Sequence, residues 1–163
     1  MELPKRKLQR LAGYDYSTPN YYYVTICTHD KKCMFGEINK LNYIGKTAET
    51  ELLKITEHYN CVKIDKYVVM PNHIHIIVVI DYNCTAERSR PFPTLSKIIG
   101  LYKSGVAKQI HKQYPNFEVW QKSFYDTIIR NERAYNEIVK YIEENPDKWE
   151  SDEYFKRWNK WNR

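Results

Sequence analysis

Residues 68–80, "VVMPNHIHIIVVI", decide the fold and raise the main chemical question. Apolar and β-branched residues on both sides of a Pro-Asn pair predict two strands joined by a tight turn, at about Val62–Met70 and His73–Ile80. Alternate residues of a strand share one side of a sheet, so His73 and His75 point the same way, about 7 Å apart along the chain. Buried imidazoles need polar partners, so that side of the sheet must offer something to both rings.

The composition indicates a folded chain. Its 163 residues are 42% hydrophobic and 15% aromatic, which suits one domain with a substantial core. We expect a single domain over 1–163, with a basic N-terminal arm at 1–20 and C-terminal helices at 131–163. Neither a membrane-spanning run nor the apolar segment of a signal peptide is present, so we expect a cytoplasmic protein with no membrane partner.

The four cysteines show no Cys-x-x-Cys spacing, and a cytoplasmic chain of this size needs no disulfide framework. Cys27, His29 and Cys33 are a candidate start for a zinc site. A second Cys/His pair at ligand spacing is missing, so zinc is the weaker alternative.

The formal net charge is +6, and Lys and Arg are concentrated in the first ten and last eight residues. Basic ends attract polyanions. Fifteen tyrosines and four tryptophans suit single-stranded nucleic acid, because bases stack on rings while phosphates meet cations. A basic protein with an aromatic core has the same composition, so composition alone does not decide between them.

The order of predicted elements indicates an α+β fold. A strand at 21–28, a helix at 46–59, the two strands above, a helix at 94–113 capped by Thr94, and a short strand at 117–120 ("FEVW") give the order of a ferredoxin-like, RRM-like sandwich with an antiparallel sheet. Two further helices are predicted, Glu132–Glu144 and one that begins at Pro146. The last carries a stripe of aromatic residues, Trp149, Tyr154, Trp158 and Trp161.

The helix Glu132–Glu144 is the natural cover for the histidine face. It would bring Tyr141 and Asn145, one helical turn apart, over His73 and His75. Two imidazoles and an amide oxygen can bind a divalent cation, which would neutralise charge on a phosphate under attack. Tyr141 would then be placed as the nucleophile.

Each of these residues also has a purely structural explanation. His-x-His in a strand is more often a satisfied core pair, Asn145 before Pro146 could cap the last helix, and Tyr141 on a half-apolar helix could be core. The residues alone therefore indicate metal-assisted phosphoryl transfer without establishing it.

Three segments resemble a known family. "YVVMPNHIHIIV" (67–78) resembles the HUH motif, histidine-hydrophobe-histidine, of single-tyrosine transposases that act on single-stranded DNA. "VWQKSFYDTIIRNERAYNEIVKYIEENPDKW" (119–149) is similar to the second signature of REP-associated tyrosine transposases and their insertion-sequence 200/605 relatives. "RLAGYDYSTPNYYYVTICT" (10–28) resembles the start of that family.

The resemblance implies an HUH nuclease fold and a defined chemistry. His73 and His75 match the motif's metal ligands, Asn145 matches the third ligand position, and Tyr141 matches the nucleophile. Members use Mg²⁺ or Mn²⁺, cut single-stranded DNA beside a hairpin, hold the 5′ end on tyrosine and leave a free 3′-OH. The competing nucleophiles are Tyr125 and Tyr135, which rank lower because neither lies one turn before a polar ligand candidate.

Candidate DNA contacts lie elsewhere in the chain. The candidate phosphate contacts are Arg6, Arg10, Lys97, Lys103 and Lys108, although a solvated helix face explains the lysines equally well. Trp120 and Gln121 fall in the family's WQ signature, and we expect them near the site. The closing aromatic stripe could stack bases or belong to the core.

The leading hypothesis is a transposase and endonuclease that cleaves and rejoins single-stranded DNA hairpins. The main alternative is a catalytically silent, domesticated or RRM-like module that binds structured single strands. A replication-initiating or conjugative nuclease with the same site is a third reading. Palindrome-associated members tend to be monomers with the tyrosine acting in cis, whereas insertion-sequence relatives are dimers that exchange the tyrosine helix. The length and the C-terminal region of this chain favour the monomer over the homodimer.

Overall fold

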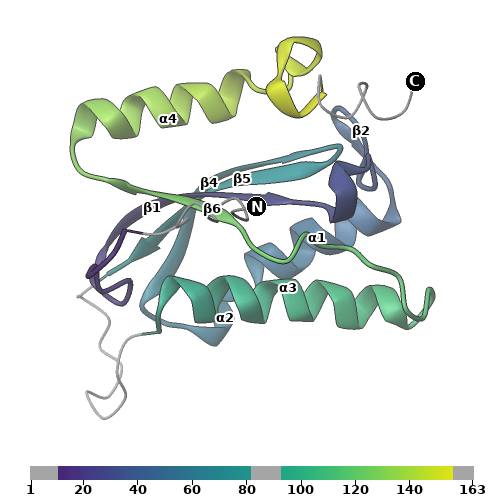
Figure 1. Cartoon of the computed structure of the whole chain (residues 1–163), viewed down its shortest axis with the longest axis horizontal. Helices are drawn as coiled ribbons and strands as arrows, with labels where there is room; N and C mark the ends of the chain where they lie inside the picture. The colour runs from purple at the N-terminus through teal and green to yellow at the C-terminus, as the bar shows by residue number, and fades with distance from the viewer. Residues whose placement is uncertain (1–10, 82–92, 156–163) are drawn as a thin grey trace, which may run out of the picture.

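An antiparallel four-stranded sheet forms the centre of the computed structural model, which describes residues 11–81 and 93–155 (Figure 1). Its strands are β1 (Asn20–Cys27), β4 (Val62–Met70), β5 (His73–Ile80) and β6 (Tyr125–Ile129). They lie in the order β4-β5-β1-β6, and every neighbouring pair is antiparallel. The strand that comes first in the chain is therefore internal, as in a ferredoxin-like sandwich, and the predicted α+β fold class is confirmed.

Helices cover both faces of the sheet. On one face lie α1 (Tyr43–Leu53), α2 (Ile55–His58) and α3 (Leu95–His111), and on the other lies α4 (Glu132–Glu144) (Figure 1). The short elements are the β2–β3 hairpin (Gly36–Glu37 and Lys40–Leu41) and the 3₁₀ helices η1 (His29–Lys31) and η2 (Trp149–Ser151). In the described part of the chain, no helix has the length and apolar character needed to cross a membrane.

The alternation predicted for β5 is confirmed. One set of its side chains enters the large core beneath α1 and α3: Ile74, Ile76, Val78 and Ile80. On the opposite face, Ile77 and Val79 form a smaller cluster with Ile142 of α4. His73 and His75 belong to this second face by the period of two, so α4 covers the histidine side of the sheet as expected.

Helix α4 has the bounds predicted from the sequence. Asn131 caps its start, because its side chain accepts a hydrogen bond from the backbone N–H of Ala134 at 2.8 Å. Its apolar side packs on the smaller cluster through Ile138, Val139 and Ile142. The predicted cap at Thr94 is also present, where the side chain accepts from Lys97 N at 3.3 Å.

The strand predicted at 117–120 is wrong. Within it, Trp120 makes one isolated bridge to Thr28, and the fourth strand is β6, which pairs with β1 along Tyr21–Thr25. Both segments contain β-branched and aromatic residues. Cross-strand pairing with β1, rather than local propensity, selects the second of them.

Two predicted helices also differ. The helix expected at 46–59 begins earlier, where Asn42 caps α1 by accepting from Gly45 N at 3.0 Å, and it is interrupted at Lys54 before α2. The helix expected from Pro146 is instead a turn followed by η2. The reason is that Asp152 caps the next helical residues, accepting from Tyr154 N at 2.7 Å. Trp158 and Trp161 lie outside the described residues.

Candidate active site

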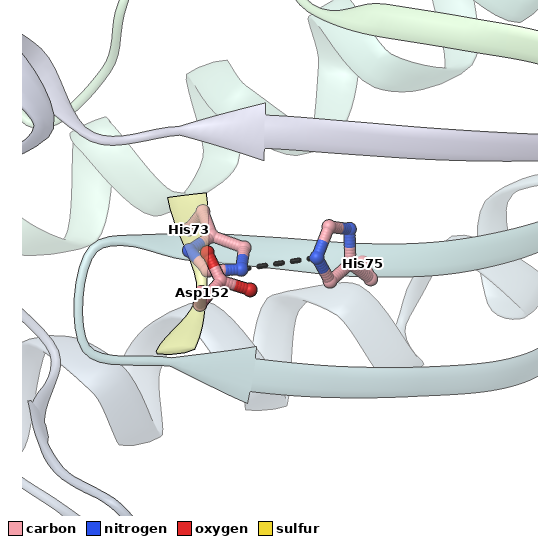
Figure 2. A group of neighbouring side chains, drawn as sticks. All are labelled: His73, His75 and Asp152. Atoms are coloured by element: carbon pink, nitrogen blue, oxygen red, sulfur yellow. Dashed lines mark hydrogen bonds between the residues drawn. The ribbon is translucent and has the colours of Figure 1, made fainter. Parts of the chain in front are cut away.

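Two buried imidazoles form the centre of the candidate site (Figure 2). His73 is 0% exposed and His75 is 1% exposed. Because the residues alternate along β5, both rings leave the same face of the sheet, and their Nε2 atoms are 3.0 Å apart. The pair therefore presents two nitrogen atoms to a single point.

The other nitrogen of each ring has a fixed partner. His73 Nδ1 lies 2.8 Å from Asn72 Oδ1, and because that oxygen only accepts, the ring donates from Nδ1, which leaves Nε2 as the acceptor of the 3.0 Å hydrogen bond with His75 Nε2. His75 Nδ1 lies 2.8 Å from both the Tyr23 hydroxyl and Thr25 Oγ1. Hydroxyls donate or accept, so the His75 ring keeps a partner in either tautomer. Such outer partners orient the imidazoles of metal sites.

Burial keeps both rings neutral. It lowers the pKa of His75 to about 3. It also lowers the pKa of His73 well below its usual value, assisted by His75 and partly opposed by the Asn145 side chain. A neutral imidazole is the form that binds metal ions, so both rings are competent ligands at neutral pH.

Asn145 follows α4 and is buried, and its side chain interacts with His73. Its Nδ2 donates to Asp152 Oδ2 at 3.2 Å. Its Oδ1 is buried and has no hydrogen-bond partner among the described residues. The alternative role considered from the sequence, a cap for the last helix, is excluded, because its backbone is in the right-handed helical region and its side chain reaches Asp152.

Asp152 is a site residue that the sequence analysis missed. It is buried, and one of its carboxylate oxygens lies with a nitrogen of His73 and one of His75 in a group whose ligand atoms are all within 4.8 Å of one another (Figure 2). In the described part of the chain this is the one group of three His, Cys, Asp or Glu side chains that could hold a metal ion. The sequence analysis expected a continuous helix from Pro146. It therefore missed Asp152, because the observed turn is what places Asp152 over β5.

Tyr141 borders the site and is reachable from solvent. Its side chain is 43% exposed, and its ring centroid lies 5.3 Å from that of His75. Its hydroxyl donates to Asp152 Oδ2 at 3.4 Å. Partial burial and the nearby Asp152 raise its pKa, while Asn145 lowers it. The phenol is therefore protonated at neutral pH and needs activation before it can act as a nucleophile.

The two competing tyrosines have other surroundings. Tyr135 donates to Asp65 Oδ2 at 2.6 Å, which raises the pKa of Tyr135 to about 12, and its ring packs on Tyr21. Tyr125 is an exposed residue of β6. Of the three tyrosines, Tyr141 is the one whose ring packs on an imidazole of the pair in the described part of the chain.

Aromatic residues after α4 cover the histidines. The Tyr154 ring lies 4.4 Å from the His73 ring, between centroids, and Trp149 lies 6.0 Å from it. Asn72 holds this cover in place, because its Nδ2 donates to the Tyr154 carbonyl at 3.3 Å. Two members of the predicted aromatic stripe thus pack on the site.

The lysines predicted to contact DNA lie apart from the histidines. Lys97, Lys103 and Lys108 are on α3, beneath the opposite face of the sheet (Figure 1). Lys103 is partly buried and donates to the Gln121 carbonyl, and burial lowers its pKa. Their contact with DNA stays a prediction. Arg6 and Arg10 lie outside the described residues.

Trp120 and Gln121 adjoin the end of β1. Trp120 Nε1 donates to the Lys103 carbonyl at 3.0 Å, and its ring packs against Phe35 on the large core. Gln121 N donates to the Cys27 carbonyl at 3.0 Å, and Cys27 is the β1 residue opposite His73. The pair therefore joins α3 to the strand beside the site and makes no recorded contact with the imidazoles. The weaker zinc alternative at Cys27, His29 and Cys33 forms no ligand cluster among the described residues.

Comparison with known proteins identifies the family. The family model described as "Transposase IS200 like" matches residues 17–145. The chain therefore belongs to the IS200-like transposases, a family whose members cleave and transfer DNA. The match includes His73, His75, Tyr141 and Asn145 and ends before Asp152.

Three individual proteins are similar to this chain in sequence or in fold. An uncharacterised protein of Haemophilus influenzae is 32% identical over 92% of this chain and 93% of its own length. A REP-associated tyrosine transposase, solved bound to a REP hairpin, is similar in structure with a TM-score of 0.59 and 19% identity, over 86% of this chain and 73% of that one. A transposase candidate from Deinococcus radiodurans has a TM-score of 0.52 and 16% identity, over 82% and 95%.

Proposed function

We propose that this transposase cuts and rejoins single-stranded DNA beside hairpins through a 5′-phosphotyrosine link on Tyr141. A divalent cation, Mg²⁺ or Mn²⁺, would be held by His73, His75 and Asn145. The observation that carries the proposal is the position of an accessible tyrosine, whose ring centroid lies 5.3 Å from that of the buried, neutral His75.

The donor set fits such a cation. Adjacent ligands in an octahedral shell at about 2.1 Å, the geometry that Mg²⁺ prefers, are about 3 Å apart, and the two Nε2 atoms are 3.0 Å apart. The unpartnered Oδ1 of Asn145 supplies an oxygen beside them. When bound, the ion would stabilise negative charge on the scissile phosphate as a Lewis acid.

Tyr141 would carry the bond exchange. Its hydroxyl oxygen forms a bond to phosphorus, the bond from phosphorus to the 3′-oxygen breaks, and the phenolic proton is released as the 3′-oxygen gains one. A free 3′-OH and a 5′-phosphotyrosine result. Because one phosphoester replaces another, the reverse attack by a 3′-OH rejoins the strand without an external energy source.

Further observations support the proposed substrate class and assembly. The solved relative is bound to a REP hairpin, which supports hairpin DNA as the substrate class here, with Arg6, Arg10 and the α3 lysines as candidate phosphate contacts. The Tyr141 and His75 side chains meet within one chain. This supports a monomer in which the tyrosine acts in cis.

The test is covalent capture of DNA. The protein is incubated with labelled single-stranded hairpins from the DNA flanking its gene, with Mn²⁺ or with EDTA, and separated on a denaturing protein gel. We expect a labelled band that requires Mn²⁺, is absent in Tyr141→Phe and persists in the matched control Tyr135→Phe. A band that persists in Tyr141→Phe would contradict the choice of nucleophile.

A binding module is the second candidate, and one observation favours it. Both imidazoles are almost completely covered, as they would be in a domesticated protein that holds hairpins without cutting them. Such a protein would shift a labelled hairpin on a native gel and form no covalent band. Cleavage by the pure protein with Mn²⁺ would exclude it.

A further inference from the structure

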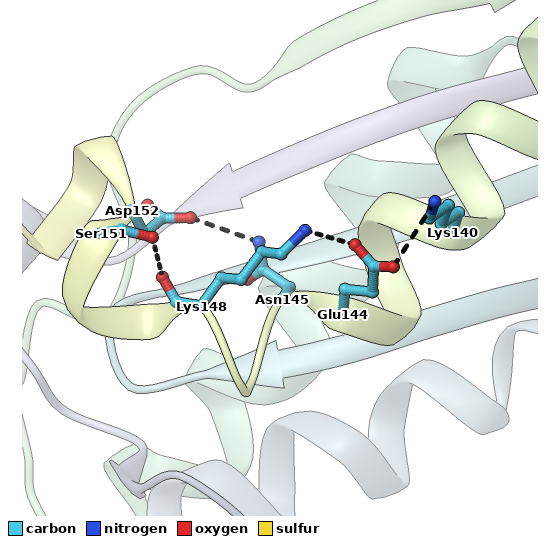
Figure 3. A network of polar contacts seen from close by, with 6 residues as sticks. All are labelled: Lys140, Glu144, Asn145, Lys148, Ser151 and Asp152. Carbon is cyan, nitrogen blue, oxygen red and sulfur yellow. Dashed lines mark hydrogen bonds and ion pairs between the residues drawn. The ribbon is translucent and has the colours of Figure 1, made fainter.

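One oxygen of Asp152 contacts two residues of the candidate site. Asp152 Oδ2 accepts from Asn145 Nδ2 at 3.2 Å (Figure 3). The same oxygen accepts from the Tyr141 hydroxyl at 3.4 Å. Asn145 and Tyr141 lie one helical turn apart, whereas Asp152 comes from the segment beyond α4, outside the residues that the family model matches. The contact therefore links this segment to both residues at once.

The carboxylate determines which way the Asn145 amide faces. An ionised carboxylate only accepts hydrogen bonds, so it requires the NH₂ group of the amide on its side. The Asn145 oxygen must then face away from Asp152, where it is buried without a partner. An unsatisfied buried acceptor costs roughly 1–3 kcal/mol, which is tolerable where the oxygen has a ligand to bind.

Asp152 itself is less available to a cation than its position suggests. Oδ1 accepts from the Tyr154 N–H at 2.7 Å, and Oδ2 accepts from two side chains. The Asn145 oxygen accepts from none in the described part of the chain. The hydrogen bonds therefore assign the free acceptor to Asn145 and an orienting role to Asp152.

We propose that Asp152 is a positioning residue, whose carboxylate turns the Asn145 oxygen toward the imidazole pair and holds the Tyr141 hydroxyl beside it. The inference rests on the proposed function, since it describes how that site is arranged. It differs from a role as a direct cation ligand, which the proximity of Asp152 to His73 and His75 would also allow.

A double-mutant cycle on cation affinity separates the two roles. Mn²⁺ binding is measured by titration calorimetry, without DNA, for the wild type, Asp152→Ala, Asn145→Ala and the double variant. If Asp152 acts through Asn145, each single change weakens Mn²⁺ binding by about 10–100-fold and the double variant is no weaker than Asn145→Ala. Losses that multiply, or an unchanged affinity in Asp152→Ala, would overturn the assignment.

A second variant controls for folding, because Asp152→Ala also removes the acceptor for Tyr154 N. Asp152→Asn keeps an oxygen for that bond but presents an amide that donates as well as accepts, so Asn145 is no longer held in one orientation. We expect a wild-type melting temperature and a loss of Mn²⁺ affinity close to that of Asp152→Ala. Wild-type Mn²⁺ affinity in Asp152→Asn would overturn the proposal.

The proposed effect of Asp152 on the Tyr141 hydroxyl is tested by kinetics at saturating Mn²⁺. Misplacing a reacting group costs up to about 100-fold in rate, so Asp152→Asn should lower kcat for covalent capture tenfold or more with KM for the hairpin unchanged. A wild-type rate of Asp152→Asn at saturating Mn²⁺ would refute the proposed effect on Tyr141. If the wild type forms no covalent product, the proposed function fails, while the Mn²⁺ cycle still decides the orienting role.

Discussion

The two faces of the central sheet differ in what they bury. The face beneath α1 and α3 buries a large apolar cluster that includes Ile74, Ile76 and Val78. The face beneath α4 buries a small apolar cluster at one end of β5 and, at the other, a group of polar side chains: Thr25, Asn72, His73, His75, Asn145 and Asp152. One strand, β5, supplies residues to both.

On the face beneath α4, polar groups that could take part in a reaction replace apolar side chains that would stabilise the fold. Burying polar groups costs free energy unless each is hydrogen-bonded, and this face uses hydrogen bonds from β1 and from the turn before β5 to hold two neutral imidazoles. Apolar side chains at the same positions would stabilise the fold without needing these hydrogen bonds. The polar face is therefore the one on which function is expected.

Substituting two neighbouring residues of β5, His75 and Ile76, should give the largest contrast between the two faces. His75→Ala removes a nitrogen from the proposed cation site and should lower the rate of covalent capture by about 10³-fold or more, several kcal/mol of transition-state stabilisation. Circular dichroism should show that the fold is retained. Capture at the wild-type rate would mean that the polar face is not catalytic.

Ile76→Ala is the matched change on the apolar face. Ile76 is completely buried in the large core, so truncation should lower the free energy of unfolding by about 2–5 kcal/mol. Urea denaturation measures this loss. Mn²⁺ affinity of the folded protein should not change, and a marked loss of affinity would show that the two faces are coupled through β5.

Acid should lower the stability of the fold through the two buried histidines of the polar face. The folded chain keeps His73 and His75 neutral, whereas the unfolded chain protonates them below about pH 6.5. The unfolded state then binds more protons, so stability falls as the pH drops from about 6.5 toward 3. At pH 5, protonation of each ring in the unfolded chain should lower the free energy of unfolding by up to about 2 kcal/mol.

Urea midpoints measured in EDTA between pH 7 and pH 5 test this expectation. His75→Gln should flatten the pH dependence, while the matched surface change His58→Gln should leave it as in the wild type. An equal slope in His75→Gln and the wild type would contradict the assignment of a neutral, buried imidazole.

The smallest expected effect concerns the start of α4. Asn131→Ala removes the side chain that caps Ala134 N and should lower the free energy of unfolding by about 1 kcal/mol. Covalent capture should be unaffected, because the cap lies at the opposite end of α4 from Tyr141. A large loss of capture would indicate that the whole helix must be rigid for the reaction.

The sequence was informative wherever a local rule sets the structure. Alternation along β5 placed His73 and His75 on one face, and the Asn-Pro pair at 145–146 marked the end of α4, which the structure bears out. The fourth strand was misplaced because its position depends on pairing with β1, a contact between distant parts of the chain.

Asp152 could not be found from the sequence for a similar reason. A continuous helix from Pro146 would have sent it along a helix face, and no residue spacing signals the turn that returns it to β5. What directs it there is tertiary, namely its contacts with Asn145, Tyr141 and the Tyr154 backbone. An acidic residue among aromatic neighbours was the one available sign.

The partners of the imidazole Nδ1 atoms have a consequence for binding strength. Asn72 anchors one ring, while Tyr23 and Thr25, from the interior strand β1, anchor the other. Ordering a free side chain on binding costs about 0.5–1.5 kcal/mol, and these rings have been ordered by folding itself. The cation proposed for this site would therefore be held without further loss of side-chain entropy, and coordination positions would remain for the phosphate of the proposed DNA substrate.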